Sequence, residues 1–156
     1  MKNVEYIKEL FTNRMFVTPL ISWLAAQIIK VIIHLLVNKE FSPERLFGDG
    51  GMPSGHSATV IALTTTAAIV YGLGSAPFAI SAVLAVIVMN DAVGVRRETG
   101  RHAKKINVIW DKMFSTELAN TEKLKVFVGH SPFQVIIGAC LGFTIALFVN
   151  LVLFNF

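Results

Sequence analysis

Charged residues are scarce in this chain of 156 residues: they make up 15% of it, against roughly 25% in soluble globular domains. Hydrophobic residues reach 54%. They gather in four long runs, each close to the ~20 residues that a helix needs to cross a bilayer, at residues 17–37, 56–73, 76–95 and 132–154. This scarcity of charge excludes a soluble globular protein and predicts a polytopic membrane protein.

Cysteine is almost absent, since Cys140 stands alone in the fourth run. It cannot form a disulfide within the chain, and we interpret it as a small packing residue. No arginine-rich transit pattern or signal cleavage site precedes the first run, so we expect that run to be retained. The chain also lacks zinc- or calcium-type ligand spacing, nucleic-acid motifs and internal repeats. We therefore expect neither a metal nor a nucleic-acid partner.

The predicted fold is an all-α, polytopic integral membrane bundle, with about four transmembrane helices in a single domain over residues 1–156. Apolar residues also recur at helical spacing, among polar ones, in residues 2–14 and 103–128. Such amphipathic segments are typical of helices that lie in the membrane interface. We predict one interfacial helix in each of these two segments.

The second run opens with a distinctive turn: residues 50–57 read Gly-Gly-Met-Pro-Ser-Gly-His-Ser. One interpretation is ordinary helix-start punctuation by proline, serine and glycine. The other is a phosphate cradle, because the first amides of a helix lack internal partners and carry partial positive charge. In that case His56 is placed to protonate a leaving oxygen.

Polar residues inside the first run share one helix face: Gln27, Lys30 and His34 follow Trp23 at spacings that stack along the helix. Lys30 could snorkel to the interface. It lies about two turns inside the end of the run, however, and its face also carries an amide and an imidazole. We favour a polar stripe directed into the bundle, with His34 in a structural, hydrogen-bonded role.

Four crossings would bring four chain segments to one side of the membrane. They carry Lys30 and His34, then Ser54, Gly55 and His56, then Asp91 with Arg96 and Arg97, and finally His130. Cations, histidines and a helix N-terminus at one membrane face predict a site for a phosphorylated headgroup. Taken alone, the arginine pair is more typical of topological anchors, and only its convergence with the other groups favours a site.

These motifs resemble the type 2 phosphatidic acid phosphatase superfamily, in a small divergent branch related to acid phosphatases and vanadium haloperoxidases. Its signatures are K-x6-R-P, P-S-G-H and S-R-x5-H-x3-D. The second is intact at residues 53–56, and the third is similar to two separate blocks, Asp-Ala-Val-Gly-Val-Arg-Arg at 91–97 and Gly-His-Ser-Pro at 129–132. His102 also follows Arg96 at the right spacing, but without the expected continuation, so we choose His130. The first signature survives as Lys30, with Arg45 as a substitute for its arginine.

The resemblance implies a mechanism without metal or cofactor. His130 would attack phosphorus and form a phosphohistidine, and His56 would protonate the leaving oxygen. Lys30, Arg96 or Arg97, and the amides of Ser54, Gly55 and His56 would hold the phosphoryl oxygens. The departure is Gln134, which stands where the superfamily has an acid four residues after the nucleophile.

On one helix face, the Gln134 amide would accept the ring N–H of His130 without supplying negative charge. A glutamate there is therefore expected to preserve or raise activity. Asp91 could supply the missing carboxylate, or could pair with Arg96 or Lys30.

Three functions remain open from the sequence. The first is a membrane phosphatase acting on a lipid phosphate or pyrophosphate, and the second is a lipid-phosphate binder or transporter without efficient turnover. The third is a structural membrane subunit whose motifs only pack helices. Close helix contact at Gly138 and Gly142 fits all three. The four runs disfavour a soluble haloperoxidase. Four spans would make a thin bundle, so we also consider a homodimer.

Positive charge predicts the orientation in the cell membrane. The two loops on the motif side carry ten Lys and Arg residues, and the N-terminal segment on the other side carries three. The positive-inside rule then places the motif loops in the cytoplasm and both termini outside.

Overall fold

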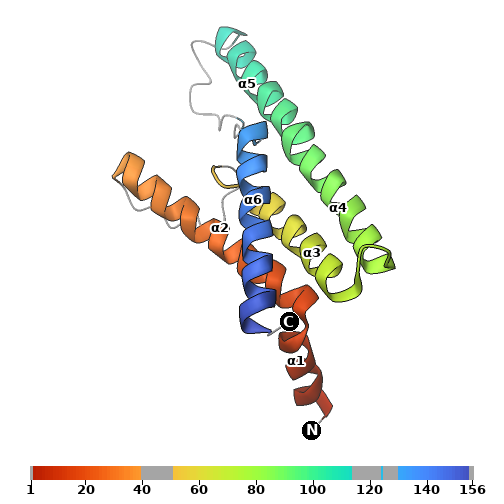
Figure 1. The fold of residues 1–156 in the computed structure, drawn as a ribbon. Coiled ribbons are helices and arrows are strands. Elements are labelled where there is room, and N and C mark those ends of the chain that lie inside the picture. The colour runs from red at the N-terminus through yellow and green to blue at the C-terminus, as the bar shows by residue number, and fades with distance from the viewer. Residues whose placement is uncertain (1, 40–50, 114–123, 125–129, 155–156) are drawn as a thin grey trace.

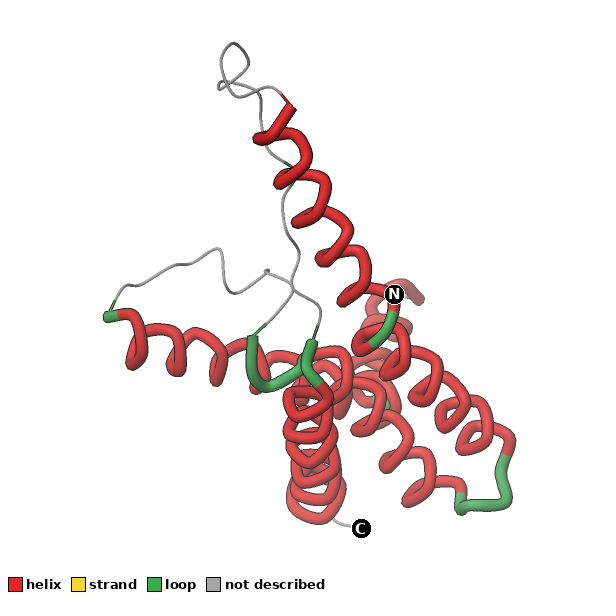
Figure 2. Tube along the Cα trace, turned by 90° about the horizontal axis from the view of Figure 1, so that it is seen from above, coloured by secondary structure: helices red, strands yellow, loops and turns green. Residues whose placement is uncertain are grey.

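The computed structural model describes residues 2–39, 51–113, 124 and 130–154, and within these ranges it contains helices and loops but no strand (Figure 2). The helices are α1 (Lys2–Thr12), α2 (Arg14–Asn38), α3 (Gly55–Tyr71), α4 (Ala76–Val93), α5 (Val95–Met113) and α6 (Pro132–Phe148), which continues as the π-helix η2 (Val149–Leu153) (Figure 1). The prediction of an all-α membrane bundle is confirmed.

Serine and asparagine side chains set where the main helices begin. The N-caps of α2, α3, α4 and α6 are Asn13, Ser54, Ser75 and Ser131. In each of them, the side-chain oxygen accepts a hydrogen bond from an amide two or three residues later. Such caps satisfy an amide that has no partner inside the helix. The Pro-Ser-Gly-His turn therefore starts a helix, as both interpretations of it require.

Helix α3 is the centre of the bundle and packs against α2, α4 and α6. Its residues Ala58, Ala62 and Ala67 are fully buried. A Cβ at Gly138 of α6 would overlap the carbonyl oxygen of Ser54, and one at Gly142 would overlap that of Ala58. The two backbones can approach this closely only because the glycines have no side chain. The close helix contact expected at Gly138 and Gly142 is thus confirmed.

Helices α4 and α5 form one long rod whose upper part, α5, projects beyond the bundle (Figure 1). Gly94 lies between them, but its amide donates to the Asn90 carbonyl (2.8 Å) and its carbonyl accepts from Glu98 (3.1 Å). Backbone hydrogen bonding thus passes from one helix into the next. The interfacial helix predicted at 103–128 is therefore misplaced: the helix begins at Val95, directly after α4, and residues 114–123 and 125–129 lie outside the described part.

Three of the described helical segments are long and apolar enough to cross a membrane: Arg14–Asn38, Ala76–Met113 and Pro132–Leu153. Helix α3 has 17 residues, about 26 Å at 1.5 Å per residue. The outer faces of the helices remain apolar, as Ile80, Val83 and Ile136 illustrate, which suits contact with lipid. Cys140 lies on such an exposed face, so its interpretation as a packing residue is wrong.

Candidate active site

Three helix ends and one side of α2 converge at one end of the bundle. The Ser54 amide, at the start of α3, donates to the Gln134 carbonyl in the first turn of α6 (3.2 Å). The amide of His130, just before α6, donates to the Ala92 carbonyl at the end of α4 (3.2 Å). Lys30, in the second half of α2, reaches the start of α3 beside Gly55. The structure thus brings together the segments that the four-pass topology predicted to meet.

The rings of His56 and His130 form a T-shaped pair at this junction. Their centroids are 6.2 Å apart and their planes are perpendicular, at 89°. A phosphoryl group bridging two nitrogens needs a separation on the order of 8 Å or less, from hydrogen-bond lengths of about 2.8 Å. His130 is only 2% exposed, whereas His56 is half-buried. The 6.2 Å between the ring centroids lies within this limit, and His130 holds the more buried position of the pair.

Lys30 is held between two glycines of the motif loop and helix. It is 8% exposed. A Cβ at Gly51 would lie 3.9 Å from its Cγ and Cδ, and one at Gly55 would lie 3.8 Å from its Nζ. The stem thus runs along Gly51 and the ammonium lies at the N-terminus of α3. Lys30 faces the bundle, as the polar-stripe interpretation predicts, and not the outer surface.

The hydroxyl and the amide of Ser54 are hydrogen-bonded to other groups of the protein. Its hydroxyl accepts hydrogen bonds from the Ser57 amide (3.3 Å) and the Ser57 hydroxyl (3.0 Å). Its amide is bonded to Gln134 as described above. Gly55 holds the first helical position of α3, where an amide has no acceptor within the helix. Of the amides predicted to cradle phosphate, that of Ser54 therefore has a structural role, and those of Gly55 and His56 remain candidates.

Gln134 does not share a helix face with His130, so that expectation is wrong. Helix α6 begins at Pro132, after His130, and Gln134 is its third residue. The Gln134 Oε1 accepts a hydrogen bond from the Ser131 amide (2.9 Å), and the Ser131 hydroxyl accepts one from the Gln134 amide (3.3 Å). This reciprocal pair is a capping box. The pattern Ser-x-x-Gln at 131–134 is its signal in the sequence.

The remaining charged candidates are placed only in part. Asp91 is half-buried in α4, next to Ala92, whose carbonyl holds the His130 backbone. Arg96 and Arg97 lie in the first turn of α5, and their side chains are outside the description. Arg45 also falls outside the described residues. Gln27 is buried on the same face of α2 as Lys30, at 7% exposure.

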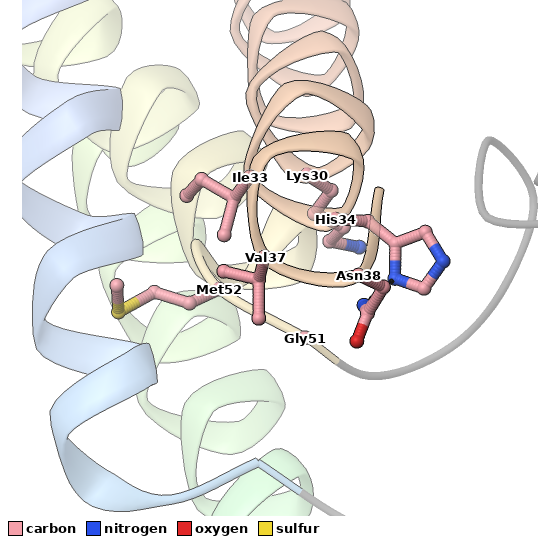
Figure 3. A pocket seen from close by; sticks show the side chains of 7 residues that line it. All are labelled: Lys30, Ile33, His34, Val37, Asn38, Gly51 and Met52. Carbon is pink, nitrogen blue, oxygen red and sulfur yellow. Dashed lines mark hydrogen bonds between the residues drawn. The ribbon is translucent and has the colours of Figure 1, made fainter. Parts of the chain in front are cut away.

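His34 borders a pocket near the end of α2 that shares Lys30 and Gly51 with the junction. Its Nδ1 lies 2.6 Å from the Nδ2 of Asn38, which agrees with the structural role expected for it. The pocket has a volume of about 160 Å³ and is open to one side; its lining residues are Lys30, Ile33, His34, Val37, Asn38, Gly51 and Met52 (Figure 3). Ile33, Val37 and Met52 form an apolar wall facing α6, while His34 and Asn38 lie on the other side of the helix (Figure 3).

Trp23 belongs to this junction but was not predicted as a site residue. A Cβ at Gly55 would lie 3.5 Å from its Cδ1 and 3.8 Å from its Nε1. Its position on the stripe with Gln27 and Lys30 is visible in the sequence. Its contact with the start of α3 depends on how α2 and α3 dock. That register is fixed by contacts such as the one from the Ser22 hydroxyl to the Ala58 carbonyl (3.0 Å).

Among the described residues, no group of three or more His, Cys, Asp or Glu side chains is placed to hold a metal ion. The polar groups that meet at the junction are instead imidazoles, an ammonium, an indole N–H and helix amides. Most of these are hydrogen-bond donors, which together suit an anion.

Comparison with known proteins adds a family and one close relative. The sequence profile described as the divergent PAP2 family matches residues 11–145. The uncharacterized membrane protein YuiD of Bacillus subtilis (strain 168) is 40% identical over 150 residues, which cover 89% of this chain and 95% of that protein. No solved structure matches the chain.

Proposed function

This chain belongs to the divergent PAP2 family, and we propose that it is a membrane phosphatase acting on a lipid phosphate or pyrophosphate. The observation that carries the proposal is the perpendicular pair of His56 and His130, 6.2 Å between centroids, beside the ammonium of Lys30. Two imidazoles and a cation at the same end of the bundle supply the nucleophile, the acid and the positive charge that a two-step phosphoryl transfer requires.

In the first step, a ring nitrogen of His130 attacks phosphorus as the bond from phosphorus to the leaving oxygen breaks. His56 gives its proton to that oxygen, and a phosphohistidine remains. In the second step, His56 takes a proton from water, the water oxygen attacks phosphorus, and the bond from phosphorus to nitrogen breaks. Inorganic phosphate leaves, and both imidazoles return to their starting states.

Charge develops on the phosphoryl oxygens during both displacements. Lys30 and the amides of Gly55 and His56 would stabilise it, because the Lys30 ammonium lies at the N-terminus of α3, where these amides also stand. Burial of Lys30 strengthens this effect, since an ion pair in a water-poor site is screened less than one at the surface. The partner implied is a membrane lipid with a phosphorylated headgroup.

Phosphate release by the purified protein in lipid–detergent micelles tests the proposal. His130→Ala is expected to abolish release, and His56→Ala to reduce it most for substrates with poor leaving groups, since general acid catalysis contributes roughly 10²–10⁴-fold. His102→Ala is the matched control, because His102 lies exposed on α5. Full activity in His130→Ala would exclude the mechanism.

A second function, lipid-phosphate binding with little turnover, is favoured by one observation. The side-chain oxygen of Gln134 caps α6, so no carboxylate at that position supports the imidazolium of His130. In a serine protease triad, replacing the acid by its amide lowers turnover by about 10⁴. Retained phosphate binding without release from any lipid phosphate would favour this binder over the enzyme.

A further inference from the structure

We propose that the indole N–H of Trp23 is a further ligand of the bound phosphoryl group, together with Lys30 and the start of α3. The inference rests on the phosphate site of the proposed function and deepens it, because it adds a residue that neither the superfamily motifs nor the sequence patterns assign to the site. The shared ligand chemistry is a phosphoryl oxyanion, whether it belongs to a lipid headgroup or to free phosphate.

The first argument is the kind of groups that meet beside Gly55. An indole nitrogen can only donate a hydrogen bond, and a lysine ammonium has three hydrogens and no acceptor. The first amides of a helix are donors as well. None of these groups can satisfy another. An anion with several oxygens can accept hydrogen bonds from more than one of these donors, and the partial charge at the helix N-terminus favours it.

The second argument is geometric. The point where a Cβ of Gly55 would stand lies 3.8 Å from Nζ of Lys30 and 3.8 Å from Nε1 of Trp23. The two nitrogens are therefore no more than about 7.6 Å apart. One phosphoryl group with a hydrogen bond on either side spans on the order of 8 Å, so it can reach both. Oxygens placed near that point can be shared by both donors.

The position of Trp23 along α2 explains how two residues seven apart reach one point. Helical side chains lean toward the N-terminus of their own helix, so the long stem of Lys30 extends back toward Trp23. Trp23 lies about 10 Å deeper along the axis at 1.5 Å per residue. Its indole thus bounds the site on the side nearer the middle of the bundle, and Lys30 bounds it on the side nearer the helix end.

Gly55→Ala offers a sharp test, because the new methyl would occupy the shared point. Its nearest neighbour would be Cδ1 of Trp23 at 3.5 Å, an ordinary van der Waals contact, and alanine favours a helix more than glycine does. The variant should therefore fold with unchanged or higher thermal stability. It should lose phosphate binding by at least an order of magnitude, because the methyl excludes the phosphoryl oxygen.

The binding measurement uses the two tryptophans of the chain. In a Trp110→Phe background, Trp23 is the sole indole, and its emission can be followed in detergent micelles as inorganic phosphate is added. We expect a saturable change with phosphate, a similar change with short-chain phosphatidic acid, and none with phosphatidylcholine. Adding Gly55→Ala should remove both responses. A response to phosphatidic acid alone would show that the site takes headgroups and not free phosphate.

Trp23→Phe tests the N–H itself, because it keeps a ring and removes the donor. Calorimetric titration with inorganic phosphate should show affinity on the order of tenfold weaker than in the matched control Trp110→Phe, the effect of losing one hydrogen bond to a charged group. In the enzyme assay, Trp23→Phe should cost more free energy in kcat/KM than it costs in the free energy of unfolding. Equal phosphate affinity in Trp23→Phe and Trp110→Phe would overturn the inference.

The two proposals fail in different ways. Phosphate binding that depends on Trp23, without release of phosphate from any lipid, would leave this inference standing and contradict the enzymatic function. Normal phosphate release with unchanged KM and phosphate affinity in Trp23→Phe would contradict this inference and leave the enzymatic function standing. Absence of a Trp23 fluorescence response to phosphate and to phosphatidic acid alike, in a folded protein, would contradict the assignment of Trp23.

Discussion

His130 and His56 differ in exposure, and the difference matches the roles proposed for them. The proton-transfer group must give a proton to the leaving group and later take one from water, so it needs contact with solvent during the cycle. His56 is half-buried and meets that need. The nucleophile gains from exclusion of water, which strengthens the electrostatic interactions around it. His130, at 2% exposure, suits this second role.

Gln134→Ala and Gln134→Glu should separate a structural from a chemical role at that position. Alanine removes the acceptor for the Ser131 amide and should lower stability by about 1 kcal/mol. Glutamate retains the capping box and places negative charge at a helix N-terminus, so stability should hold. Because the side-chain oxygen at 134 is directed to Ser131, we expect Gln134→Glu to change turnover by less than about threefold.

Thermal unfolding in detergent and phosphate-release rates measure these two effects. A rise in turnover of about tenfold or more in Gln134→Glu would show that the new carboxylate leaves the cap and supports the His130 imidazolium. That outcome would restore the role expected for residue 134 from the superfamily pattern.

Single residues show where sequence reasoning succeeded and where it failed. Lys30 was singled out because an ionisable group inside an apolar run needs a partner. His56 and His130 were singled out from the membrane side they share and from the superfamily motifs. Gln134 was misassigned because spacing four residues apart means a shared face only inside a helix, and the helix starts after His130. Trp23 was missed because its contact with Gly55 depends on the docking of two helices.

At the level of helices, close approach between α3 and α6 positions the site. Gly138 lies against Ser54, the N-cap of α3, and Gly142 lies against Ala58 one turn further. The same pair of helices is joined by the bond from the Ser54 amide to the Gln134 carbonyl. Separating the helices would therefore move the start of α3, and with it His56, away from His130.

Gly142→Val should be strongly destabilising for this reason. The side chain would overlap the carbonyl oxygen of Ala58, and overpacking of this kind costs about 1–3 kcal/mol or more. Cys140→Val is the matched control, since Cys140 is exposed on the same helix and should tolerate the change. Thermal midpoints in detergent provide the comparison, and phosphate release should fall in parallel. Equal midpoints for the two variants would contradict the close packing of α3 on α6.

Helix boundaries could be predicted where caps mark them, as Ser54 and Ser131 do. The junction of α4 with α5 could not, because glycine after an apolar run usually signals a helix end. Here Gly94 donates to Asn90 and accepts from Glu98, so the chain continues as a helix. Glycine permits a break without enforcing one, and hydrogen bonding on both sides decides the outcome.

In the whole molecule, the candidate active site lies at one end of the bundle, and the path of the chain explains why. Lys30 of α2 lies there and α3 starts there. Helix α4 returns there from the turn at residues 72–75, because the Ala92 carbonyl meets the His130 amide. Helix α3 must therefore run the length of the bundle between the two ends. Its 17 residues reach about 26 Å, slightly less than the ~30 Å hydrocarbon core. We still expect α3 to cross the membrane, because it packs against the three helical segments that are long and apolar enough to do so.

The orientation of this end is the last prediction, and it follows from charge. The motif-side loops hold ten Lys and Arg residues against three in the N-terminal segment; without Arg45, Arg96 and Arg97, whose charges phosphate binding would also explain, the ratio is still seven to three. The positive-inside rule therefore places the site in the cytoplasm. Single cysteines at Lys112 and Asn3, in a Cys140→Ala background, can be probed on intact cells with a membrane-impermeant thiol reagent. We expect labelling at position 3 and protection at position 112. The opposite pattern would place the site outside, because Lys112 lies on α5, which continues from the motif end of α4.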